Sequence, residues 1–119
     1  MKALFDTNIL IDYLNGKPAA KAELARHRDR LISVITWMEV LADARDEGET
    51  DVLEMFLRDF VVVELTRPIA RGAIELRRSH RLRLPDAIVW ATARDQSALL
   101  VTRDTKAFPE DEPGVRVPY

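Results

Sequence analysis

The sequence predicts an α/β layer fold around a central and mostly parallel sheet. Short apolar runs rich in β-branched residues alternate with longer segments that have a helical period. Strands separated by helices need crossover connections, which join parallel strands. A chain of 119 residues is also long enough to bury one well-packed core. We therefore expect a single domain over residues 1–119.

The expected strands are short and apolar. The runs LISVI at 31–35 and ALLVT at 98–102 have the β-branched composition that favours strands. The run VVVEL at 61–65 is apolar without alternation, which is typical of a strand buried on both faces. With the first and last candidates, the expected strands are residues 2–5, 31–35, 61–65, 98–102 and 115–117.

The expected helices have apolar residues at helical spacing and recognisable ends. Pro18, Pro68 and Pro85 suit the first turn of a helix, where a missing amide hydrogen is tolerated. Thr36 is an N-cap residue type, and Gly48 is a typical stop after the helix that we expect to begin there. The expected helices begin near residue 8 and then run over 18–28, 36–46, 51–60, 68–80 and 85–96.

Composition excludes several classes of protein. With 47% hydrophobic and 32% charged residues, the chain resembles a globular protein. No apolar run is long enough to span a membrane, and Asp12 breaks the only stretch, residues 9–14, that resembles a signal peptide core. The absence of cysteine excludes disulfides, thiol catalysis and thiolate metal sites. We expect a cytoplasmic protein with no membrane partner.

The charge distribution is more informative than the net charge of −2. Residues 39–59 carry a local charge of −6, and residues 67–83 carry +5. This asymmetry indicates a side that faces a polyanion, although two solvated helix faces would give the same pattern. The arginines that could hold RNA phosphates, unless they are only solvated or contact an acidic partner, are Arg77, Arg78, Arg81 and Arg83.

Four acidic residues form the candidate site, and each also has a local structural explanation. Asp6 could cap the helix that follows the first strand. Glu39 completes a capping box with Thr36. Asp86 lies in a first turn, where the helix dipole favours negative charge, and Asp104 could accept a backbone hydrogen bond in a turn.

The placement of these acids favours a shared role. Asp6, Glu39 and Asp104 all follow predicted strands, and ligands bind outside the carboxyl ends of parallel strands. Two carboxylates about 5 Å apart repel by roughly 3 kcal/mol, so such a cluster must take up protons, spread apart or hold a cation. Mg²⁺ or Mn²⁺ prefers oxygen ligands of this kind. We expect the neighbouring Thr7, Asn8 and Thr102 to orient the carboxylates.

Four stretches in this order resemble the PIN-domain nucleases, and in particular the VapC-type toxins of bacterial toxin–antitoxin pairs. They are FDTNILIDYL at 5–14, ISVITWMEVL at 32–41, LPDAIVWATAR at 84–94 and VTRDTKAF at 101–108. The resemblance implies a three-layer α/β/α fold and a Mg²⁺- or Mn²⁺-dependent endoribonuclease that acts as a toxin, pairs with a small antitoxin protein and forms a homodimer. It also implies a catalytic and metal-binding quartet of Asp6, Glu39, Asp86 and Asp104.

One position departs from the resemblance. Many relatives have a further acid directly before the phenylalanine of the last motif, and this chain has Ala107 there. All four core acids are present, so we interpret the difference as a subfamily feature that puts a second metal ion in question. We expect Asp6, Asp86 and Asp104 as the main ligands, with Glu39 either a ligand through water or the group that orients the attacking water.

Three alternative functions are weighed against the nuclease. A catalytically idle module could use the same fold to bind RNA or a protein, but it would gain nothing from the repulsion among the four acids. A phosphoacceptor signalling domain needs a suitably spaced lysine, whereas VTRDTK offers only Arg103 and Lys106. Histidine catalysis would depend on His27 or His80, and neither has a recognisable partner in the sequence.

The two tryptophans are expected in the core or in a dimer interface. Trp37 and Trp90 lie in apolar stretches of expected helices. Stacking on an RNA base is the alternative role for such side chains.

Overall fold

The computed structural model describes all residues, 1–119, and confirms an α/β fold with a parallel sheet. The elements, in chain order, are β1 (Ala3–Phe5), α1 (Thr7–Leu14), α2 (Pro18–Ala25), β2 (Arg30–Ser33), α3 (Val34–Ala42), α4 (Glu47–Leu57), β3 (Val61–Val63), α5 (Arg67–His80), α6 (Leu84–Asp95), β4 (Leu99–Val101) and β5 (Val115–Arg116). No helix has the length and apolar character needed to cross a membrane.

The sheet has a topological switch point beside its central strand. The strand order is β3-β2-β1-β4-β5, and all neighbours are parallel. The chain first builds outward from β1 through β2 to β3, and then crosses back to place β4 on the other side of β1. Connections therefore leave β1 and β4 in opposite directions, which opens a crevice at their carboxyl ends.

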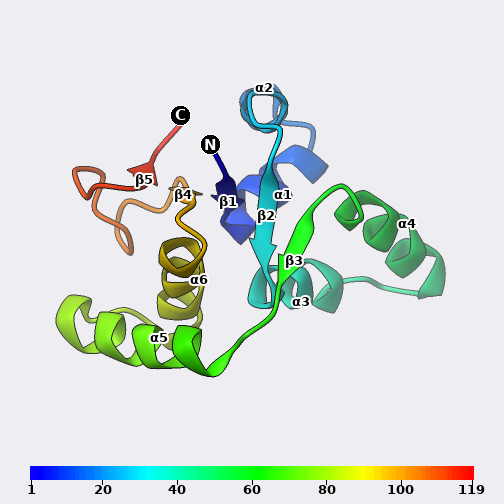
Figure 1. Cartoon of the computed structure of the whole chain (residues 1–119). Helices are drawn as coiled ribbons and strands as arrows, with labels where there is room; N and C mark the ends of the chain where they lie inside the picture. The colour runs from blue at the N-terminus through cyan, green and yellow to red at the C-terminus, as the bar shows by residue number, and fades with distance from the viewer.

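The strands alternate between two cores, one on each face of the sheet. Leu4 and Leu100 pack with the apolar side chains of α5 and α6, including Trp90. Phe5 and Val101 pack with residues of α1 to α4 on the other face. Successive strand residues point to opposite faces, so this alternation produces the three layers; Figure 1 shows α5 and α6 on one side of the strands and α4 on the other. Trp90 is 1% exposed, which confirms its expected place in the core.

The start of α3 differs from the prediction. The helix begins at Val34, because the side chain of Ser33 caps it by accepting a hydrogen bond from the Ile35 amide at 3.0 Å. The prediction of Thr36 as N-cap, in a capping box with Glu39, is therefore wrong. The β-branched pair at 34–35 continues the apolar run of β2, so composition alone did not reveal that the strand had ended.

The other differences also have local causes. The helix α4 begins at Glu47 rather than at residue 51, because Asp46 caps it by accepting from the Glu49 amide at 2.8 Å. Gly48 accordingly lies in a first turn and does not end the preceding helix. The strand β3 is at the sheet edge, and Val61 is 63% exposed, so the expectation of a fully buried strand is wrong. The helix α2 ends at Ala25, three residues before the predicted end.

Candidate active site

Asp6 lies at the carboxyl end of β1 and caps α1. Its Oδ1 accepts a hydrogen bond from the Thr7 amide at 2.8 Å. Its Oδ2 accepts from the Thr102 hydroxyl at 2.8 Å and from the Asn8 side-chain amide at 3.1 Å. Burial raises the pKa of Asp6 to about 6, against the lowering effect of its Thr102 and Thr7 hydrogen bonds, and the charges of Asp86 and Glu39 raise it further.

Asp104 follows β4, on the other side of the switch point. Its Oδ1 accepts hydrogen bonds from the amides of Lys106 at 3.1 Å and Ala107 at 3.2 Å, which closes a turn. Its own amide donates to the Thr102 hydroxyl at 3.0 Å. Thr102 therefore contacts both Asp6 and the turn that carries Asp104, while no protein donor binds Asp104 Oδ2.

Glu39 reaches the same region from α3. It is exposed, and its Oε1 accepts a hydrogen bond from the Thr7 hydroxyl at 2.6 Å. The hydroxyl oxygens of Thr7 and Thr36 lie 3.0 Å apart. Thr36 therefore contacts the hydroxyl that holds Glu39, and it does not cap its own helix. Thr7 thus donates its amide hydrogen to Asp6 and its hydroxyl hydrogen to Glu39. Asn8 and Thr102 donate to Asp6 Oδ2, so the expected roles of these three residues in holding the carboxylates are confirmed.

Asp86 lies in the first turn of α6 and is half-buried. Its carboxylate accepts no hydrogen bond from any group of the chain, unlike that of Asp6 or Asp104. Burial raises the pKa of Asp86, the charge of Arg83 lowers it, and the charges of Asp104 and Glu39 raise it. Asp86 is therefore the carboxylate of the four with both oxygens free for a ligand.

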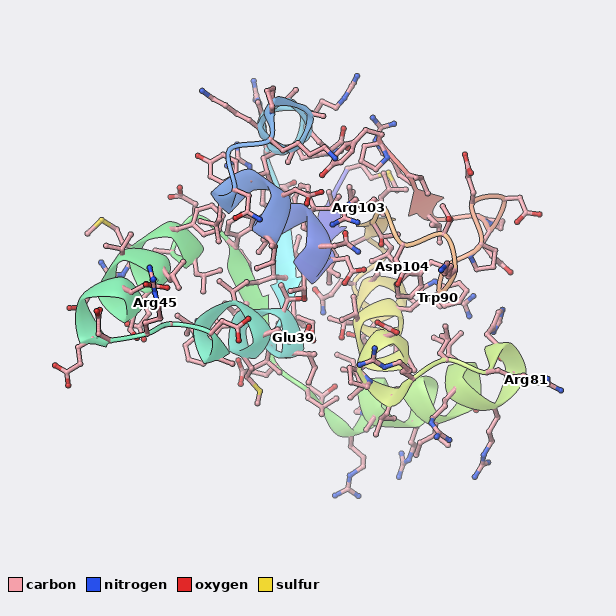
Figure 2. The ribbon with its side chains drawn as sticks, turned by 180° about the vertical axis from the view of Figure 1, so that it is seen from behind. Glu39, Arg45, Arg81, Trp90, Arg103 and Asp104 are labelled. Carbon is pink, nitrogen blue, oxygen red and sulfur yellow. The ribbon has the colours of Figure 1, made fainter.

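The four acids lie near one another at the carboxyl ends of the strands, but they are not close enough together to form a complete metal site. Each of Asp6 and Asp86 is within electrostatic reach of two of the other acids. No group of three or more aspartate, glutamate or histidine side chains is close enough to hold one metal ion directly. In Figure 2, Glu39 on α3 and Asp104 after β4 lie on the two sides of the start of α1, whose Thr7 and Asn8 contact both segments.

The chemistry of the donor set fits a hard dication. All available atoms are oxygens: both oxygens of Asp86, Oδ2 of Asp104 and Oε2 of Glu39 have no donor within the chain. Raised pKa values at Asp6 and Asp86 are expected where carboxylates share a partly buried site, and a bound cation would lower them. Mg²⁺ usually keeps several bound waters, so some carboxylates of a site contact the ion only through water.

Both histidines have carboxylate partners, which corrects the expectation that they had none. His27 Nε2 lies 2.9 Å from Glu23, within a buried cluster that also includes Arg116. His80 Nε2 lies 3.6 Å from Glu112, and its ring packs edge-on against Trp90. These contacts hold the two rings in structural positions.

Sequence reasoning missed one ion pair that borders the site. Arg103, directly before Asp104, binds the carboxylate of Asp12 with its Nε at 2.6 Å and its Nη2 at 3.1 Å. The Tyr119 hydroxyl donates to the same carboxylate at 2.7 Å. The signal was the carboxylate of Asp12 within the apolar run 9–14, because a buried charge needs a partner.

The chain is similar to known proteins over nearly its whole length. The family described as PIN domain matches residues 3–110. Ribonuclease VapC19 of Mycobacterium tuberculosis is 36% identical over 125 residues, and the match covers 98% of each protein. A toxin–antitoxin complex from Klebsiella pneumoniae contains a chain that is 42% identical, with a TM-score of 0.93, over 99% of this chain and 98% of that chain. The DNA-bound VapBC of Salmonella typhimurium, at 24% identity and a TM-score of 0.82 over 98% of this chain and 96% of that chain, shares the fold. The chain belongs to the PIN-domain family.

Proposed function

We propose that the chain is a metal-dependent endoribonuclease that acts as the toxin of a toxin–antitoxin pair. Its similarity to a protein named as a ribonuclease, over 98% of both chains, supports the reaction class. The observation that carries the proposal is the gathering of Asp6, Glu39, Asp86 and Asp104 around the switch point, with raised pKa values at Asp6 and Asp86. Such perturbed carboxylates in a crevice are typical of functional sites.

In this proposal each acid has its own task. Asp86 and Asp104 would hold Mg²⁺ or Mn²⁺ with their free oxygens, and Asp6 would complete the site from its buried position. When bound, the ion would supply Lewis acidity to the phosphodiester and lower the pKa of a water molecule. Thr102 fixes Asp6 and the Asp104 turn relative to each other. Glu39, with Oε1 held by Thr7, directs its free Oε2 at the attacking water or binds the ion through water.

The proposal includes a small antitoxin protein as partner. The Klebsiella pneumoniae relative is described as a toxin–antitoxin complex. This chain exposes large apolar side chains on α3 and α4, where Met38 is 54%, Val52 67% and Met55 66% exposed, and such surfaces are typical of protein contacts. The proposal also includes a homodimer, which the mass of the purified protein in solution tests. It places the protein in the cytoplasm, where RNA is available.

The decisive experiment measures metal binding and RNA cleavage together. Purified protein is incubated with RNA and Mg²⁺ or Mn²⁺, beside an EDTA control and the variants Asp6→Asn and Asp86→Asn. Asp51→Asn, at an exposed position on α4 away from the site, is the matched control. We expect cleavage that needs the ion. It should be lost in the two site variants and should persist in Asp51→Asn.

The same samples test the alternative of an idle binding module. Titration calorimetry with Mn²⁺ should show binding that is weakened in Asp86→Asn and unchanged in Asp51→Asn. RNA binding without Mn²⁺ binding or cleavage would overturn the nuclease and favour the module. Cleavage that resists both chelation and the site substitutions would place the reaction elsewhere.

A further inference from the structure

A basic cavity adjoins the acidic site. It has a volume of about 350 Å³ and lies where the end of α5, the start of α6 and the turn after β4 meet. That volume is at the lower end of the range for ligand pockets in proteins, and is enough for one nucleotide-sized group. Its polar lining comprises His80, Arg81, Arg83, Asp86, Asp104 and Lys106. The cavity therefore shares two carboxylates with the proposed metal site and adds cations.

The three exposed cations of this cavity form no ion pairs. Arg81, Arg83 and Lys106 are exposed, and none of them forms an ion pair with a carboxylate of the chain. Arg103 and Arg116, by contrast, each bind a buried carboxylate. A dication held by Asp86 and Asp104 would neutralise the acidic wall, so the cavity would then present net positive charge.

The backbone positions of these three basic residues are set by the same turns and helix ends that carry the acids. The Lys106 amide donates to Asp104 Oδ1 at 3.1 Å, so the turn that presents Lys106 is closed by a site carboxylate. Arg83 is the N-cap residue of α6 and lies within electrostatic reach of Asp86. Arg81 ends α5 in the left-handed conformation, with φ of 54°, where glycine is usual. In Figure 2 the side chain of Arg81 points outward from the end of α5, which places it at the outer rim.

We propose that this cavity binds a backbone phosphate of the RNA strand adjacent to the phosphate that is cleaved, through Arg83 and Lys106, with Arg81 at the rim. The proposal rests on the proposed function and names the part of the site that positions the strand. It also divides the basic segment: Arg77 and Arg78 are exposed on α5 but do not line the cavity, so they do not take part. Phosphate contacts of this kind fix register and orientation without reading sequence.

The first test measures RNA binding without cleavage. Fluorescence anisotropy with a labelled single-stranded RNA is recorded at one fixed concentration of Mn²⁺ on the Asp6→Asn background, which is expected not to cleave, over a series of salt concentrations. Adding Lys106→Ala should weaken binding about tenfold and lower the slope of log K against log salt by about 0.7, the value for one lost phosphate contact on a single strand. Lys106→Arg should keep the slope. Arg78→Ala, a matched exposed arginine on α5, should change neither quantity.

The second test uses cleavage of two substrates by the protein with its metal. A dinucleotide has no flanking phosphate, so Lys106→Ala should change its kcat/KM much less than that of a longer oligonucleotide, for which KM should rise about tenfold. Arg83→Gln serves as the second variant, and circular dichroism confirms that each variant is folded. Equal affinity, slope and KM in Lys106→Ala, Arg83→Gln and the unchanged protein would overturn the cavity's role.

The two proposals fail in different ways. If no ion supports cleavage but Lys106→Ala still lowers the salt slope, the nuclease is wrong and the phosphate site stands. If cleavage depends on Asp86 but the slope is the same in Lys106→Ala and Arg78→Ala, the nuclease stands and the phosphate site is wrong.

Discussion

Arg103 and Asp12 form a two-point ion pair that holds the segment leading to Asp104 against α1. Arg103 Nε and Nη2 lie 2.6 and 3.1 Å from the two carboxylate oxygens of Asp12, and Tyr119 donates to the same carboxylate. The hydrogen bond from Arg103 lowers the pKa of Asp12. Arg103, which directly precedes the proposed metal ligand Asp104, is thus held by Asp12 of α1, and Tyr119 at the end of the chain supports Asp12.

Asp12→Asn should loosen this segment. The substitution keeps the shape of the side chain but removes the charge that binds Arg103, so we expect a loss of about 2 kcal/mol in the free energy of unfolding. Because the pKa of Asp12 is lowered by folding, its stabilising effect is present at neutral pH and is lost as the pH falls through that lowered value. Urea denaturation at neutral and acid pH measures this, and the deficit of the variant should shrink in acid.

The same variant should cleave RNA more slowly, because Asp104 is less well positioned. Tyr119→Phe is the matched control: it removes one hydrogen bond to Asp12 and leaves the ion pair, so about 1 kcal/mol and a smaller loss of kcat are expected. A kcat in Asp12→Asn equal to that of the unchanged protein would show that the ion pair does not position Asp104.

Glu23→Gln should destabilise the fold without a specific effect on the site. Glu23 is 3% exposed and binds Arg116 of β5 at 2.6 and 2.9 Å, so the change leaves the Arg116 guanidinium without its counter-charge. A loss of about 3 kcal/mol in the free energy of unfolding is expected for a broken buried pair. Thermal and urea denaturation measure it.

Arg45→Ala provides the contrast on the surface. Arg45 lies just before α4 and pairs with Glu49 in the first turn of that helix at 3.0 Å, and the Arg45 side chain is 86% exposed. Figure 2 labels Arg45 beside α4. Exposed pairs of this spacing contribute about 0.5 kcal/mol or less. Equal losses in Glu23→Gln and Arg45→Ala would contradict the structural importance of burial at Glu23.

The stability of the metal-free protein should depend on the protonation of Asp6. The pKa of Asp6 is about 6 in the folded protein and 3.8 ordinarily, so the folded protein binds the proton more tightly. Asp6 therefore stabilises the fold at low pH, and this contribution is lost as the pH rises from 3.8 through 6. Between pH 5 and pH 8 the loss is about 1 kcal/mol.

The measurement compares the unchanged protein with Asp6→Asn in EDTA. Because the asparagine side chain does not titrate, the stability of the variant relative to the unchanged protein should rise by about 1 kcal/mol from pH 5 to pH 8. Taking the change with pH cancels the constant effect of altered hydrogen bonds to Thr7, Asn8 and Thr102. If the difference in stability between the two proteins does not change with pH, folding does not raise the pKa of Asp6.

The strands and most helices could be predicted from the sequence, and the four acids could be singled out as candidates, because these depend on local patterns. Strand runs, first-turn prolines and carboxylates at strand ends can all be recognised within a few residues. The cap at Ser33 was missed because the apolar run continues past it into α3. The pair of Asp12 with Arg103 spans 91 positions, and only the adjacency of β1 and β4 brings the segments that follow them together. The unpaired state of Lys106 and Arg83 likewise follows from the fold.

Thr7→Val should separate the two roles left open for Glu39. Valine keeps the branched shape and the backbone amide that donates to Asp6, but it removes the hydroxyl that holds Glu39 Oε1 at 2.6 Å. If Glu39 orients the attacking water, kcat should fall by about tenfold while Mn²⁺ affinity stays unchanged, since residues that orient site groups typically contribute 10- to 100-fold. Thr7→Ser retains a hydroxyl and should restore most of the rate. Calorimetry and single-turnover cleavage on the same preparations decide the case, because a parallel fall in Mn²⁺ affinity and kcat would identify Glu39 as a ligand through water.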